Sequence, residues 1–163
     1  MNRWYWLGLG GVACAGVIAV VIMLMLPKPP IPGPIKSQLT STLILPDTSR
    51  YPVDRSTTKY DAKIKQLTFN STAFSQDVVV SEQPTPDSFT DVPQVYQKVL
   101  ESMSDFADFD TGIGTVHLTR PANLGGKQAA VLNAKGTLLF AKPSSDLTED
   151  QWRQFFNSVD VSR

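Results

Sequence analysis

The chain has 163 residues, and its 15 lysines and arginines balance its 15 aspartates and glutamates. This length suits one globular domain with a small addition. The balanced charge excludes a strong basic bias, so we expect no nucleic-acid partner. The single cysteine, Cys14, excludes an intramolecular disulfide, so a hydrophobic core must stabilise the fold.

The first element in the chain is an apolar segment over residues 4–26, which follows a short tail of residues 1–3. The segment contains no charge and no proline, and about 20 apolar residues suffice to span a bilayer as a helix. The apolar region of a cleavable signal peptide is shorter, about 7–15 residues, and ends at small residues. Here the small residues 13–15 lie in the middle of the segment. The sequence therefore predicts an uncleaved signal anchor, a single-pass transmembrane helix.

The orientation of this helix depends on weaker signals. Arg3 lies before the helix and Lys28 and Lys36 lie after it, so the positive-inside count is nearly balanced. The rest of the chain has no cysteine and is rich in serine and threonine, which favours export. We therefore expect a protein of the cell membrane whose carboxyl-terminal domain is extracytoplasmic.

A proline-rich linker over residues 27–36 comes next, and half of its residues are proline. Such a composition is typical of a stiff, extended spacer with a rise of about 3.1 Å per residue. The sequence thus predicts that the linker holds a separate domain, residues 37–163, away from the membrane.

Six segments of this domain have the composition or the alternation of β-strands. The last two flank a Lys-Gly turn and predict a hairpin. The polar segment 47–61 predicts irregular structure. The predicted strands are 38–45, 63–69, 76–83, 114–120, 127–133 and 137–142.

Two amphipathic helices are predicted. Apolar residues recur with helical spacing from Val92 to Met103 after a potential cap at Asp91. Thr148 and Gln151 form a capping box for a second helix, whose apolar face is Trp152, Phe155, Phe156 and Val159. The element order predicts an α+β fold: a curved antiparallel sheet of about five or six strands with both helices on one face, preceded by the transmembrane helix.

Asp110-Thr111-Gly112 matches the catalytic loop of aspartic proteases. That chemistry needs two aspartates about 3 Å apart, which this chain could supply only as a symmetric dimer. The sequence lacks the glycine-rich flap of such proteases, and the loop follows a predicted helix where a strand is needed. A turn that aspartate opens and glycine permits is the favoured interpretation.

Two further groups contain residue types that can bind metal ions. Asp105, Asp108 and Asp110 resemble half of a calcium loop, but their spacing does not fit an EF-hand, and a solvated acidic turn is favoured. His117 is the sole histidine and is predicted as a surface residue of its strand, facing away from Val116 and Leu118. The sequence therefore assigns no catalytic, cofactor-binding or metal-binding residue and no cofactor.

Charge is distributed in blocks along the domain. The basic block could meet anionic lipid or a wall polymer, but solvated faces that pair with one another are the favoured interpretation. The basic block is Arg50, Arg55, Lys59, Lys63 and Lys65, and an acidic block from Asp77 to Asp110 follows it.

Three stretches carry a resemblance to a known group of proteins: "LILPDTSRYPVD", "VVVSEQP" and "GKQAAVLNAKGTLLFAKPSSDLTEDQWRQFFNSV". In these stretches the chain resembles uncharacterised bacterial single-pass envelope proteins with a small α+β extracytoplasmic domain of unknown function. The resemblance implies no catalytic residue.

The sequence thus predicts a membrane-tethered, non-enzymatic binding or assembly domain at the cell envelope. Its partner would be an envelope protein, a wall polymer or a lipid. Two alternatives remain open: a tethered, aspartic-protease-like hydrolase that uses Asp110, and a lipid-carrier-like half-barrel with an apolar cavity between sheet and helices.

Overall fold

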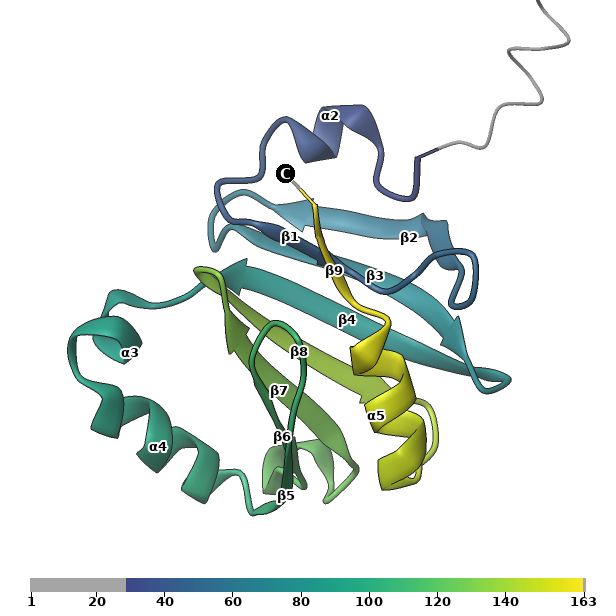
Figure 1. The fold of residues 1–163 in the computed structure, drawn as a ribbon. Coiled ribbons are helices and arrows are strands. Elements are labelled where there is room, and N and C mark those ends of the chain that lie inside the picture. The colour runs from purple at the N-terminus through teal and green to yellow at the C-terminus, as the bar shows by residue number, and fades with distance from the viewer. Residues whose placement is uncertain (1–28, 163) are drawn as a thin grey trace, which may run out of the picture.

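A large antiparallel sheet dominates the α+β structure of this chain, a computed structural model that describes residues 29–162 (Figure 1). The predicted tail at 1–3 and transmembrane helix at 4–26 lie outside the described residues. Within residues 29–162, no helix is long and apolar enough to cross a membrane.

The large sheet has seven strands in the order β2-β3-β4-β8-β7-β6-β5, and all neighbours are antiparallel. Two meanders, β2 to β4 and β5 to β8, join where β4 pairs with β8. The strands are β2 (Val53–Asp61), β3 (Gln66–Ala73), β4 (Gln76–Pro84), β5 (Asp105–Asp110), β6 (Thr115–Thr119), β7 (Ala129–Ala134) and β8 (Thr137–Pro143). A separate pair is formed by β1 (Leu43–Leu45) and β9 (Asp160–Ser162).

The predicted hairpin between β7 and β8 is confirmed. Lys135 and Gly136 form its two-residue turn, and both have positive φ, 52° and 76°. A type I′ turn needs positive φ at both of its central positions, and its twist matches that of the flanking strands.

The helices of the described chain are short. The predicted first helix, Val92 to Met103, is α4 (Pro93–Ser102). A short helix that the sequence did not predict, α3 (Asp87–Asp91), precedes it, and the two are separated at Val92, which adopts an extended conformation with φ of −133° before the proline. The predicted second helix is α5 (Glu149–Asn157), and its capping box is confirmed: the Thr148 hydroxyl accepts from the Gln151 N–H, and the Gln151 side chain accepts from the Thr148 N–H. Two short helices, α2 (Gly33–Lys36) and a 3₁₀ turn (Ala122–Leu124), complete the set.

The expectation that both long helices share one face of the sheet is wrong. Trp152, Phe155 and Phe156 of α5 pack with Leu132 of β7 in the main core, whereas Leu100 of α4 packs with Val131 of the same strand. Adjacent residues of a strand point to opposite faces, so α5 and α4 cover opposite faces of the sheet. The β1–β9 pair lies on the α5 face (Figure 1).

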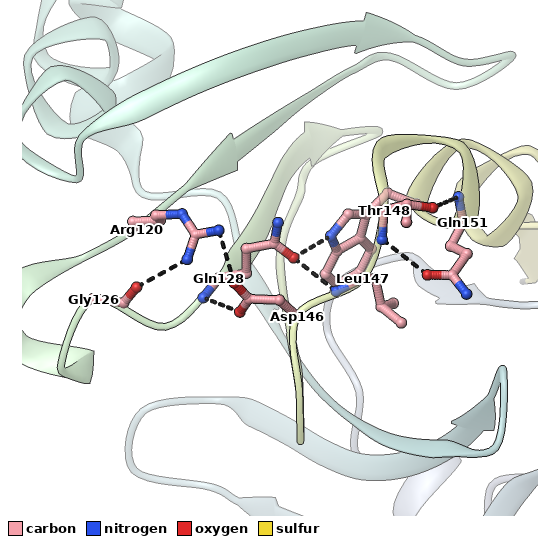
Figure 2. A network of polar contacts seen from close by, with 8 residues as sticks. Arg120, Gly126, Gln128, Asp146, Leu147, Thr148 and Gln151 are labelled. Atoms are coloured by element: carbon pink, nitrogen blue, oxygen red, sulfur yellow. Dashed lines mark hydrogen bonds and ion pairs between the residues drawn. The ribbon is translucent and has the colours of Figure 1, made fainter.

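A buried polar network fixes α5 against the sheet (Figure 2). The Gln128 side-chain oxygen accepts from the Trp152 indole N–H at 3.1 Å and from the Leu147 backbone N–H at 2.9 Å. Next to it, the Arg120 guanidinium pairs with the Asp146 carboxylate at 2.7 Å. These contacts satisfy the indole N–H, which would otherwise be costly to bury.

The predicted linker belongs to the folded domain from Ile31 onward. Ile31 is only 2% exposed, and Ile35 and Leu39 pack against the core around α2. The Tyr60 hydroxyl of β2 also donates to the Gln38 carbonyl after α2. Residues 31–36 are therefore not an extended spacer, because their isoleucines gain more from burial than from solvent exposure.

Candidate functional site

Most of the basic block and the last three residues of the acidic block lie at opposite edges of the large sheet. The basic residues Arg55 and Lys59 are on the edge strand β2, and Lys63 and Lys65 are in the turn that follows it. The acidic residues at the other edge are on β5, with five strands between. The expectation that the blocks pair with one another is therefore wrong: no salt bridge among the described residues joins them.

The Asp-Thr-Gly motif forms the turn between β5 and β6, which confirms the turn interpretation. The Thr111 N–H and hydroxyl both donate to the Gly114 carbonyl, at 2.9 and 2.7 Å. The exposed Asp110 carboxylate accepts from the Thr115 hydroxyl at 2.7 Å. However, the motif follows the strand β5, so the expectation that it follows a helix is wrong.

On the α4 face of the same hairpin, two carboxylates lie beside the histidine. The His117 Nδ1 lies 2.8 Å from the Asp108 Oδ1 and 3.5 Å from the Asp105 Oδ2. Asp108 is directly opposite His117 in the β5–β6 pairing. We call Asp105, Asp108 and His117, together with Tyr96 of α4, the edge cluster.

A β-bulge brings both carboxylates to one face. Asp105 and Asp108 are three positions apart and would point to opposite faces of a regular strand. In β5 the pairing skips Phe106, so Asp105 lies opposite Thr119 and Asp108 lies opposite His117. Because of this extra residue, both aspartate side chains point to the same face of the sheet; β-bulges commonly redirect side chains in this way.

Tyr96 covers the histidine from α4. Its ring meets the imidazole edge-on, with the centroids 5.9 Å apart, and leaves the His117 side chain only 15% exposed. Burial, followed by the carboxylates of Asp105 and Asp108, raises the pKa of Tyr96 to about 12. Burial and the neighbouring Asp108 also raise the pKa of Asp105 above its ordinary value. The expectation of a surface histidine is therefore wrong, whereas its orientation away from Val116 and Leu118 is confirmed.

A hollow of about 380 Å³ lies on the same face of the sheet, beyond the end of α4. It is lined by strand residues, among them Val79, Ser81, Phe140 and Lys142. Val79 is 38% exposed, an unusual value for valine in a central strand. The other lining residues are Gln66, Met103, Pro121, Asn123, Leu124 and Ala129. We call this the α4-side hollow.

A third unusual position is a buried carboxyl group in the main core. Glu82 of β4 is 3% exposed and lies opposite Leu67 of β3 and Leu139 of β8. One of its oxygens accepts from the Ile44 N–H of β1 at 3.2 Å, and the other has no hydrogen-bond partner among the described residues. Burial raises the pKa of Glu82 to about 8, and the Ile44 hydrogen bond opposes this only in part.

Comparisons of this chain with protein-family models, with curated proteins and with solved structures find no match. The function must therefore be inferred from the geometry of these sites.

Proposed function

We infer that this chain is a membrane-tethered, non-enzymatic binding or assembly domain of the cell envelope, and that its partner docks in the α4-side hollow. The hollow is the observation that carries the inference. Its volume lies within the range of about 300–1,000 Å³ that is typical of binding sites, and its lining combines apolar side chains with a few polar groups.

The position of the hollow in the sheet supports the proposal. The α4 helix covers Val131 and Leu138 but leaves Val79 of the neighbouring strand β4 exposed. An apolar residue in the middle of a seven-stranded sheet gains stability when it is covered. Around it, Ser81 and Gln66 offer a hydroxyl and an amide, and Lys142 offers a cation. This combination suits a segment of another envelope protein, which supplies both apolar and polar groups.

The predicted anchor gives the second support. A domain that is held at the membrane meets partners there at a high effective concentration, so modest complementarity in the hollow suffices. The orientation in which the domain is extracytoplasmic is part of the proposal.

Site-specific photocrosslinking tests the proposal. We would replace Val79 by a photoreactive phenylalanine analogue in the full, anchored chain and irradiate intact membranes. A matched variant with the analogue at Asp150, an exposed position of α5 on the opposite face, serves as the control.

We expect a discrete protein adduct from position 79 and a much weaker one from position 150. Adducts to lipid alone would instead favour a lipid-carrier function. Adducts to wall polymer would show that the partner is a polymer and not a protein. If both positions give the same adducts, the hollow is not the docking site.

A further inference from the structure

The edge cluster combines the groups that bind metal ions, and it gathers them from two parts of the fold. Asp105 and Asp108 come from β5, and His117 comes from β6. One ligand atom from each of these three residues lies within 4.8 Å of the other two. The bulge at Phe106 places the Asp105 side chain on the same face as the side chains of Asp108 and His117.

Two polar atoms of this cluster are buried without a hydrogen-bond partner among the described residues: the Asp105 Oδ1 and the Tyr96 hydroxyl oxygen. Buried polar atoms without a partner cost about 1–3 kcal/mol each, so native structures rarely keep them. The hydrogen bond between His117 and Asp108 satisfies neither atom. Their occurrence together beside the ligand set indicates that a further group completes the cluster.

The charges of the cluster indicate which kind of group fits. Two carboxylates lie together, and the nearest described salt-bridge partner of either is the imidazole of His117. No lysine or arginine among the described residues forms a salt bridge with either aspartate, so the local potential is negative. A cation bound between the two carboxylates would offset this charge.

We propose that Asp105, Asp108 and His117 bind a divalent transition-metal ion of the Zn²⁺ type, with the Tyr96 hydroxyl beside it. An imidazole with two carboxylates suits such ions, whereas Mg²⁺ and Ca²⁺ take oxygen ligands and more of them. Three protein ligands leave one position of a tetrahedral zinc site open.

The geometry requires little adjustment. Zinc ligands lie about 2.0–2.2 Å from the metal, so they stand on the order of 3.4 Å from one another. The Asp108 side chain is 52% exposed and free to rotate toward that spacing. His117 and Asp105 are held more firmly, with side chains 15% and 21% exposed, and they define the site before the ion arrives.

Zinc titration of the full chain in detergent tests the proposal. We would measure Zn²⁺ binding by competition with a chromophoric chelator for the wild type, Asp108→Asn and His117→Gln. Asp77→Asn is the matched control, because it removes one exposed carboxylate of the same sheet outside the edge cluster. Circular dichroism establishes that each variant is folded, and the exposed Asp108→Asn is expected to keep the fold.

We expect one Zn²⁺ per wild-type chain, with affinity lowered at least about ten-fold by either ligand substitution and unchanged in Asp77→Asn. Cobalt in place of zinc should give visible absorption bands in the wild type that are lost in His117→Gln. Three results would overturn the proposal: no saturable Zn²⁺ binding, wild-type affinity for Zn²⁺ in both Asp108→Asn and His117→Gln, or a preference for Ca²⁺ or Mg²⁺ over Zn²⁺.

Discussion

Glu82 shows how strongly one residue's surroundings change its chemistry. In the sequence it is one of three polar residues, Ser81 to Gln83, that follow the valines of a predicted strand. In the structure its side chain points into the main core, toward β1, and the nearest strand residues on either side are leucines. None of the groups that shift its pKa is a charged side chain, so burial dominates.

We predict that Glu82→Gln removes a pH dependence of stability. The pKa of Glu82 is about 8 in the folded chain, against an ordinary value of 4.5, so the folded state holds the proton more tightly. The stability from this group is therefore complete below about pH 4.5 and is lost as the pH rises to about 8. Glutamine keeps the shape and can still accept from the Ile44 N–H, but it does not ionise.

Thermal unfolding at pH 5 and pH 8 measures this effect. The variant should gain stability over the wild type at pH 8 relative to pH 5. Parallel pH profiles of the two proteins would show that Glu82 is not the group responsible.

The surroundings of the edge-cluster residues, like those of Glu82, were not evident from the sequence. The aspartates and the histidine were all visible in the sequence, but the pattern assigned them to a turn and a surface. The signal that could have connected Asp108 and His117 is the alternation in "DFD" (residues 108–110), which fits an edge strand before a Gly-flanked turn. The bulge, which brings in Asp105, shows in the sequence only as an interrupted alternation at Phe106 and Ala107.

At the scale of elements, the sequence predicted helices and turns correctly where a local interaction determines the structure. The β7–β8 turn depends on the backbone of two residues, and the start of α5 depends on one capping box. The buried face of α5 follows from its spacing, and Trp152, Phe155 and Phe156 are each at most 1% exposed. These features need no information from distant parts of the chain.

We predict that Thr148→Ala lowers the free energy of unfolding by about 0.5–2 kcal/mol, because it leaves the Gln151 N–H without its acceptor. Thr148→Ser retains the hydroxyl and should lose much less. Denaturant unfolding of both variants measures the difference. Equal losses in the two would mean that packing of the threonine methyl group, and not the cap, supports α5.

Other elements were missed because their residues do not carry the pattern. The strand β2 has the sequence "VDRSTTKYD", which is polar at nearly every position, and its pairing with β3 is interrupted between Asp54 and Lys59. The strand β9 has three residues and depends on β1 for its pairing. For such strands, a partner in the tertiary structure outweighs intrinsic preference.

At the scale of the molecule, the two edges of the large sheet are protected in the same way. Each edge strand carries charged side chains and an irregular register, between Asp54 and Lys59 in β2 and between Asp105 and Ala107 in β5. Charges and bulges on edge strands hinder the addition of strands from other molecules. The opposite signs of the two edges also give the sheet an electrostatic polarity.

The burial of Ile31 has a consequence for the whole protein if residues 4–26 span the membrane. Only residues 27–30 then connect the span to the core, and a chain of that length reaches at most about 18 Å between residues 26 and 31. The domain would be held with α2 close to the lipid surface, in a restricted set of orientations.

We predict that a fluorescent label at Lys36→Cys, in a Cys14→Ser background, is strongly quenched by quenchers attached to lipid headgroups. Insertion of ten Gly/Ser residues between positions 28 and 29 should reduce this quenching, because the flexible segment lets the domain move away. Equal quenching with and without the insertion would contradict the short connection.

The sequence by itself determined the α+β class, the β7–β8 hairpin, the capped helix α5 and the turn at Asp110, since each depends on short-range backbone and side-chain chemistry. Only the tertiary structure decided that α4 and α5 cover opposite faces, that Ile31 joins the core and that Asp105, Asp108 and His117 meet. These outcomes depend on strand order, on register and on one bulge. Such features are set by the packing of residues far apart in the chain, which local patterns do not encode.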